Sequence, residues 1–355
     1  MKYLAVLTVR NEAAFLLEWL AHHKSIGFTD FLVYSNDCQD GTDDMLDRLS
    51  DLGHLTHVRN DGPYDKGGIQ FTALKAASKH KAVKQADWIL PLDIDEFVNV
   101  HVGDGRIQDL TAALPDATAI TLTWRLFGNN DMSRYEDTPV TRAFTRCAPA
   151  VMHWPWRAAM FKTLYRNNGT YRKLGVHRPR NPDDEKLETA RWFDGHGREL
   201  DQKFRDRRIF SNYGRDNYGL VQLNHYALGS MESYVLKADR GRAVHSADML
   251  DVDYWVERNF NTDEDVSIGR TSDRSDLIRT ELLNDTILKK LHKNSVKWRQ
   301  DRFHELMQQE PYRALFARLL MTPPSRPVSV TSARTLTGYA NLGRRNAAGK
   351  GKKET

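Results

Sequence analysis

Two aspartates at the end of an apolar segment could bind one divalent cation. Asp93 and Asp95 stand two positions apart and follow residues 88–92, WILPL. Mn²⁺ and Mg²⁺ prefer such oxygen ligands, and they often bind through few carboxylates together with phosphate oxygens of a substrate. A cation held there would stabilise the charge that develops on a departing diphosphate. The spacing therefore predicts a site for Mn²⁺ or Mg²⁺, with a solvated acidic loop as the alternative interpretation.

A histidine and two basic residues further along the chain could complete this site. His225 lies near the end of a second apolar segment, residues 220–226, and neutral imidazole is a common ligand of the same metals. Lys237 and Arg240 follow in a segment with helical spacing, and they could bind a diphosphate. A lone histidine is more often a core residue, but the residues that follow it favour the ligand interpretation.

The elements that must position these residues alternate between strands and helices. Apolar, β-rich runs predict strands, and segments with helical spacing separate them. The predicted strands are residues 3–9, 30–35, 54–59 and 88–92, and the predicted helices are residues 12–26, 43–52 and 69–86. This order is typical of a doubly wound, mostly parallel α/β sheet, in which ligands bind beyond the carboxyl ends of the strands. Three polar groups stand at those ends and are expected to meet in one crevice: Arg10, Asn11 and Glu12; Asn36 and Asp37; and Asp93 with Asp95.

The pattern changes after the fourth strand. Residues 119–125 read as another strand, residues 126–220 as a loop-rich region, and residues 230–242 and 274–321 as helices. We therefore expect three parts, which are a catalytic domain, a helical extension and a disordered basic tail. The catalytic domain covers residues 1–245, in two parts at 1–118 and 119–245; the extension covers 246–322 and the tail 323–355.

Composition excludes several classes of protein. The chain has 355 residues and only two cysteines, Cys38 and Cys147, which excludes a disulfide scaffold and fits a reducing compartment. The net charge is +5, but residues 322–355 carry +6 of it, so the folded part is close to neutral and does not predict nucleic-acid binding. No segment has the length and apolarity of a signal peptide or a spanning helix. We expect a cytoplasmic protein whose basic tail could contact the inner membrane face.

Several motifs together resemble glycosyltransferases of family 92 and a related family-2-like set. They are LTVRNE, EWLAHHKSIG, FLVYSNDCQDGT, WILPLDIDEFV, LFGNN and LNHYALGSMESYVLKADRG, which run to about Gly241. The resemblance implies a GT-A fold, a nucleotide-sugar donor, and Asp93, Asp95 and His225 as metal ligands. It makes residues 1–118 the nucleotide-sugar half of the catalytic domain and residues 119–245 the acceptor half. It also implies that Arg10, Asn11 and Glu12 line the nucleoside end beside Asn36 and Asp37, and it points to Lys162 and His177.

The resemblance further implies a hexosyltransferase that inverts the anomeric carbon. We expect a UDP-linked donor rather than a GDP-linked one, and a glycan or glycolipid acceptor such as a surface polysaccharide or lipopolysaccharide. Inversion needs one base that takes the proton of the acceptor hydroxyl. Four acids are candidates, namely Glu96, Asp131, Glu136 and Asp137, and we favour Asp131 because it follows the segment expected to border the acceptor.

Two other functions remain open from the sequence. A phosphatase of the haloacid dehalogenase type also uses Asp-x-Asp at a strand end, but there the motif opens the fold, whereas here it follows three strand–helix units. A protein that binds a nucleotide sugar without catalysis is the other alternative. This second alternative is disfavoured because the like charges of Asp93 and Asp95 would be costly to keep together if the protein no longer bound a metal there.

Overall fold

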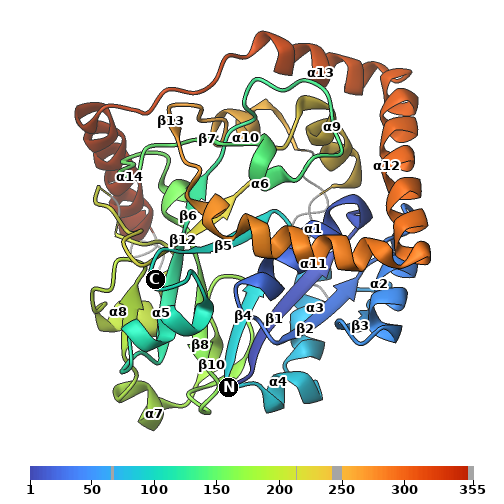
Figure 1. Cartoon of the computed structure of the whole chain (residues 1–355). Helices are drawn as coiled ribbons and strands as arrows, with labels where there is room; N and C mark the ends of the chain where they lie inside the picture. The colour runs from blue at the N-terminus through green and yellow to red at the C-terminus, as the bar shows by residue number, and fades with distance from the viewer. Residues whose placement is uncertain (65–67, 213, 242–249, 351–355) are drawn as a thin grey trace.

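A large mixed sheet forms the centre of the molecule (Figure 1). The computed structural model describes residues 1–64, 68–212, 214–241 and 250–350, with only the backbone of residues 344–350. Within these residues the main sheet has nine strands, in the order β3-β2-β1-β4-β8-β6-β12-β5, with β11 paired to β6. The strands are β1 (Tyr3–Val9), β2 (Asp30–Ser35), β3 (Thr56–Arg59), β4 (Trp88–Leu92), β5 (Glu96–Val100), β6 (Ala119–Leu126), β8 (Phe161–Arg166), β11 (Trp192–Asp194) and β12 (Val221–His225).

The first half of the chain has the predicted alternating order. Strands β1 to β4 pair in parallel. The side chains of β1, β2 and β4 are almost all buried, because helices or loops cover both faces, whereas the edge strand β3 is partly exposed. In β1, Ala5 and Leu7 join one hydrophobic cluster, while Leu4 and Val6 join the other. The helices here are α1 (Ala13–Ser25), α2 (Thr42–Asp51), α3 (Ile69–Ala77) and α4 (Lys81–Gln85). The single helix predicted over 69–86 is thus wrong, because His80 leaves the helical conformation and caps α4 with its ring nitrogen.

The main sheet also contains strands that the sequence pattern did not predict. β8 comes from the region predicted to be rich in loops, and it inserts between β4 and β6, antiparallel to both. β5 begins at Glu96, directly after the acidic motif, and pairs antiparallel with β12. Both strands are short, and neither follows a crossover helix, so a βαβ pattern does not reveal them. The α/β fold class with a mostly parallel sheet flanked by helices is confirmed.

Smaller helices and strands between residues 107 and 271 surround the main sheet. They are α5 (Ile107–Ala113), α6 (Val140–Ala143), β7 (Arg146–Cys147), a 3₁₀ turn (Trp156–Ala159), β9 (Tyr171–Lys173), β10 (Arg180–Pro182), α7 (Asp184–Glu188), α8 (Gln202–Asp206), α9 (Met231–Arg240), α10 (Val252–Val256), β13 (Asp263–Glu264) and a second 3₁₀ turn (Ser267–Thr271). Of these, α9 matters most for the site, because it begins soon after β12 ends.

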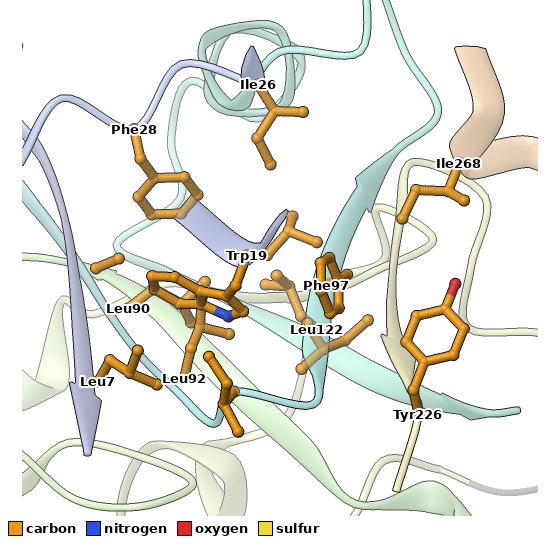
Figure 2. Packing of buried hydrophobic residues seen from close by; sticks show 14 of the residues in the cluster. Leu7, Trp19, Ile26, Phe28, Leu90, Leu92, Phe97, Leu122, Tyr226 and Ile268 are labelled. Carbon is orange, nitrogen blue, oxygen red and sulfur yellow. The ribbon is translucent and has the colours of Figure 1, made fainter. Parts of the chain in front are cut away.

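Trp19 anchors the core between α1 and the sheet. Its indole is 1% exposed, packs edge-on against Phe31 and donates a hydrogen bond from Nε1 to the carbonyl of Glu96 at 3.1 Å. Figure 2 shows it among Leu90, Leu92 and Phe97. The hydrogen bond and the packing together fix α1 against the start of β5, so the core also fixes the backbone next to the acidic motif.

The C-terminal helices cover one side of the domain. They are α11 (Ser272–Asn284), α12 (Thr286–Met307) and α13 (Glu310–Met321). α11 and α12, in orange, pack against α1, and α12 also contacts α2 (Figure 1). Asp285 caps the start of α12 by accepting from the amides of Ile287 and Leu288, and it pairs with Arg48 of α2. These helices occupy most of the predicted extension, whose expected start at residue 246 lies outside the described residues.

The predicted disordered tail is corrected in part. Residues 330–350 form α14 (Val330–Lys350), which follows the last proline, Pro327, and contains mostly residues compatible with a helix. Ala333 of this helix is 3% exposed, so one side of α14 packs on the body of the protein. Residues 351–355 of the predicted tail lie outside the described residues. In the part of the chain that the structure covers, no helix combines the length and apolarity needed to cross a membrane.

Candidate active site

A cavity of about 540 Å³ opens beyond the carboxyl ends of β1, β4 and β12. Predicted residues from five separate sequence segments line it together. They are Arg10 and Glu12 after β1, Asn36 after β2, Asp93 and Asp95 after β4, His225 at the end of β12, and Lys237 and Arg240 on α9. The parallel strands bring these segments to one edge of the sheet, where an α/β sheet binds its ligands.

Asp95 forms the centre of the polar contacts in the cavity. Its Oδ2 accepts a hydrogen bond from Lys237 Nζ at 2.7 Å, and its Oδ1 lies 3.7 Å from His225 Nε2. Burial opposes ionisation of this carboxyl, but Lys237 and His225 together hold its pKa well below the usual range. Asp95 is therefore a carboxylate over the whole physiological pH range.

Asp93 faces a different set of partners. Its Oδ1 accepts from Gln70 Nε2 at 2.8 Å and its Oδ2 from Lys162 Nζ at 2.8 Å. Lys162 is 1% exposed and comes from β8, so the lysine to which the resemblance points lies behind the carboxylate rather than on the cavity wall. Burial by itself would lower the pKa of Lys162, but the nearby Asp93 and Glu96 raise it by a larger amount. The pKa of Lys162 therefore lies above its usual value, and the lysine is charged.

Glu96 is a buried part of the same network. It accepts hydrogen bonds from Trp124 Nε1 at 2.6 Å and from the Asp93 amide at 2.9 Å, and its Oε2 lies 3.6 Å from Lys162 Nζ. Burial raises its pKa to about 8 in spite of Lys162. A side chain with no exposed surface cannot reach an acceptor, so Glu96 fits a structural role better than the role of base.

His225 is held neutral against an aromatic surface. Its ring lies 4.2 Å from the Trp124 ring, centroid to centroid, and it is 4% exposed. Burial lowers its pKa to about 3, more strongly than Asp95 raises it. His177 also lines the cavity and packs edge-on to Trp124 at 5.7 Å. Burial likewise lowers the pKa of His177, to about 4. Both imidazoles are neutral at physiological pH, the form in which histidine binds a metal.

Arg240 joins the end of α9 to the end of β1. Its guanidinium pairs with Glu12 and donates to the Arg10 carbonyl at 2.9 Å, while Arg10 donates to the Arg240 carbonyl at 3.4 Å. Arg10 Nε has no hydrogen-bond partner within the described residues. These contacts hold two arginines on the cavity wall, although 230 residues separate them in the chain.

Three predicted site residues lie away from this cavity. Asn11 lines a neighbouring cavity instead, and Asp37 is exposed and bonds to Tyr64. Asp131 has a left-handed φ of 58°, and its side chain is 61% exposed beside Arg146. Aspartate tolerates this left-handed turn conformation. The turn places Asp131 outside the lining of both cavities.

Several residues of the cavity wall carry no signal in the sequence and were not predicted. Gln70 stands at the start of α3, and two further arginines, Arg157 and Arg258, come from the loop-rich region and from beyond α10. Arg258 is 5% exposed and stacks on Tyr254 at 3.6 Å. With them, the described lining has five basic side chains against three acidic ones: Arg10, Arg157, Lys237, Arg240 and Arg258, and Glu12, Asp93 and Asp95. This excess suits a ligand with several negative charges.

Asp95 and His225 fit a divalent cation that is also bound by a substrate. Their facing atoms are 3.7 Å apart, which allows both to bind one ion at distances of about 2.1 Å. Both oxygens of Asp93 already accept hydrogen bonds. Within the described residues, no group of three or more His, Cys, Asp or Glu side chains is arranged to hold an ion. The two residues thus fit an ion whose other ligands are phosphate oxygens and water.

The comparison with known proteins identifies the family. The fold and the site define a mixed α/β protein with a basic cavity at its strand ends. The chain matches the model of glycosyltransferase family 92 over residues 5–222, and it belongs to this family. The mixed sheet flanked by helices agrees with the α/β fold class that the sequence predicted.

The similar proteins in the curated set are plant members of the family. A glycosyltransferase family 92 protein of Oryza sativa subsp. japonica is 27% identical over 143 residues, which cover 39% of this chain and 23% of that protein. One of Ricinus communis is 26% identical over 148 residues, covering 38% of this chain and 24% of that protein. The chain therefore spans about a quarter of the length of the curated relatives it matches.

Two solved structures illustrate the distant structural neighbours. S. aureus TarS 1–349 in complex with UDP-GlcNAc has a TM-score of 0.33 and 14% identity, covering 89% of this chain and 78% of that chain. Glucosyl-3-phosphoglycerate synthase from Mycobacterium tuberculosis, in complex with Mn²⁺, UDP and glucosyl-3-phosphoglycerate, has a TM-score of 0.25 and 18% identity, covering 35% and 44%.

Proposed function

We propose that this protein transfers a hexose from a UDP-linked donor to a hydroxyl group of a glycan or glycolipid, with inversion and with a divalent metal. The observation that supports this most is the pair of Asp95 and His225 in a cavity with an excess of basic side chains. Membership of family 92 supports the same reaction.

The residues of the cavity have separate proposed roles. Asp95 and His225 bind the Mn²⁺ or Mg²⁺, which when bound stabilises negative charge on the diphosphate leaving group. Arg10, Arg240 and Lys237 contact the diphosphate by charge-assisted hydrogen bonds. Asp93, fixed by Gln70 and Lys162, faces the donor beside Asp95 and orients it. Glu12 holds Arg240 in place rather than binding the donor directly.

The proposed transfer requires a base on the acceptor side. The acceptor oxygen forms a bond to the anomeric carbon, the bond from that carbon to the diphosphate breaks, and the acceptor proton passes to a carboxylate. Glu136 lines the cavity that adjoins Asp95 and Lys237, whereas Asp131 lines neither cavity. We therefore assign the proposed base to Glu136 in place of Asp131.

Calorimetric titration of UDP and of GDP, with and without Mn²⁺, tests the donor site. We expect UDP to bind in the presence of Mn²⁺, and Asp95→Asn to weaken this binding by about tenfold or more. Asp116→Asn is the matched control, because Asp116 is an exposed carboxylate paired with Arg191. Absence of nucleotide binding by the folded wild type would contradict the proposal. Binding of UDP without turnover of any UDP-hexose would favour a binding protein that lacks catalysis.

A further inference from the structure

A second cavity, of about 80 Å³, adjoins the donor cavity. Five residues line both cavities, namely Glu12, Ile94, Asp95, Lys237 and Arg240, so the two spaces meet at the proposed metal-binding carboxylate. The outer wall of the second cavity is built by α1, the loop after Met132, α9 and α12. Its position beside Asp95, away from the strand ends that hold the proposed nucleotide site, suits the acceptor.

Arg299 of α12 contributes a buried positive charge to this wall. The residue is 6% exposed, and its guanidinium lies between the rings of Phe15 and Tyr135, at 4.6 and 4.7 Å from their centroids. One nitrogen donates to Ser233 Oγ at 3.0 Å, while Nε has no hydrogen-bond partner in the part of the chain that the structure describes. Within the described residues, no ion pair of 4.0 Å or less joins it to a carboxylate, although Asp40 and Glu232 act on its charge from farther away.

A buried guanidinium without a directly paired anion is unfavourable in a protein interior. Removing the charge from water is costly, and a paired carboxylate or phosphate normally offsets this cost. A second arginine, Arg240, is close enough to feel the same charge, since its pKa is lowered to about 10, first by burial and next by Arg299. Arg240 already pairs with Glu12, so an anion in the cavity would chiefly offset the charge of Arg299. The two rings keep the guanidinium plane fixed, which favours a planar or tetrahedral oxyanion.

We propose that the second cavity is an acceptor subsite that binds an anionic group of the acceptor, a phosphate ester or a carboxylate, with Arg299 as the residue that recognises it. This inference rests on the proposed transfer function and deepens it, because it limits the acceptors to charged ones. The anionic group would lie next to the residues shared with the donor cavity, so the acceptor hydroxyl would be held near the anomeric carbon.

The experiment measures anion binding with the donor site already filled. The wild-type protein is saturated with UDP and Mn²⁺ and then titrated by calorimetry with inorganic phosphate, with glucuronate and with neutral glucose. We expect phosphate or glucuronate to bind and glucose not to bind. The preferred anion then distinguishes a phosphorylated acceptor from a uronic-acid acceptor. Arg299→Gln should weaken the anion by about tenfold or more, because a charge-assisted hydrogen bond is lost.

Control variants separate this effect from general damage. Lys297→Gln removes one charge from the exposed side of the same helix, where it pairs with Asp301, and should leave anion binding unchanged. Arg299→Lys keeps the positive charge without the planar guanidinium, so it should weaken anion binding less than Arg299→Gln does. It also tests the role of Arg299 if Arg299→Gln does not fold. All variants should bind UDP like the wild type.

Two results would overturn the inference while leaving the donor site intact. One is a wild-type protein that binds UDP but neither anion. The other is anion binding that is the same in wild type, Arg299→Gln and Arg299→Lys. If the wild-type protein did not bind UDP at all, in contrast, the result would count against the transferase function itself.

Discussion

Lys237 Nζ lies 2.7 Å from Asp95 Oδ2, so a lysine of α9 already neutralises the second aspartate of the Asp-x-Asp motif. The two residues are 142 positions apart. Lys237 also donates to the Ala227 carbonyl at 2.7 Å, which holds its charge at the junction of the two cavities. The lysine is thus positioned to balance Asp95 before a donor binds and to contact the diphosphate afterwards.

Replacing Lys237 by methionine should weaken the donor site without unfolding the protein. Methionine keeps an unbranched chain but leaves Asp95 without its cation, so we expect about tenfold weaker UDP binding in Mn²⁺ and a lower rate of UDP release from UDP-hexoses. Lys237→Arg should recover part of the affinity. Calorimetry with UDP is the measurement, and equal affinity of wild type and Lys237→Met would show that Lys237 does not contact the diphosphate.

Asp93 and Asp95 should respond differently to amide substitution. Asp95→Asn removes a metal-binding carboxylate and should abolish the effect of Mn²⁺ on UDP affinity. Asp93→Asn leaves a side chain that can still accept from Lys162, so the dependence on Mn²⁺ should persist. The measurement is UDP affinity across a series of Mn²⁺ concentrations. Loss of the metal effect in both variants would place Asp93 among the ligands, as the Asp-x-Asp spacing predicts.

Amide substitutions distinguish the two candidate bases, Glu136 and Asp131. Glu136→Gln should lower the rate of UDP-hexose turnover by a factor of about 10² to 10⁴, with UDP affinity unchanged. Asp131→Asn should keep near-wild-type turnover, because Asp131 lies in an exposed turn outside both cavities. Steady-state UDP release is the assay. The reverse pattern would restore Asp131 as the base.

The stability of the domain should fall as the pH is lowered, partly through His22. This buried residue bonds through Nε2 to the Val98 carbonyl, and burial lowers its pKa to about 4 from 6.5. At a pH between 4 and 6.5, this histidine binds a proton in the unfolded chain but stays neutral in the folded protein. His22 should therefore lower the free energy of unfolding by roughly 2 kcal/mol near pH 5 relative to pH 7.5.

His22→Gln tests this pH dependence directly. The amide can still donate to Val98, but it does not titrate. Urea unfolding at the two pH values should therefore show a smaller loss of stability for the variant than for the wild type. The pKa of the neighbouring His23 is also lowered, by burial and by His22, so some pH dependence will persist. An identical loss in both proteins would exclude His22 as a contributor.

Truncation of Trp19 should be severely destabilising. Trp19→Ala leaves a cavity between α1 and the sheet and removes the hydrogen bond to the Glu96 carbonyl, at a cost of about 3–5 kcal/mol. Leu277→Ala on α11 is the control, because that side chain is 72% exposed and should change stability by less than about 0.5 kcal/mol. Urea unfolding measures both. A small effect of Trp19→Ala would mean that the core relaxes around the lost indole.

The amino-acid sequence by itself determined the frame of this protein. Continuous apolar runs such as residues 3–9 have one stable environment, a strand covered on both faces, and the helical periods between them require parallel strands. Once those strands are parallel, residues after their carboxyl ends must meet at one edge of the sheet. For this reason the order of the apolar runs was enough to predict that Arg10 and Asp95 lie near each other, whereas His225 was added because of its residue type and the basic residues that follow it.

Only the tertiary structure decided which partners these residues have. Lys162 reaches Asp93 because β8 inserts antiparallel beside β4, and Arg299 reaches the second cavity because α12 packs on α1. Neither position carries a local signal, since a buried lysine or arginine reads like a surface residue in the sequence. The same reason explains why Asp131 was misplaced: whether a loop acid faces a cavity or solvent depends on packing between distant segments, not on its neighbours in the chain.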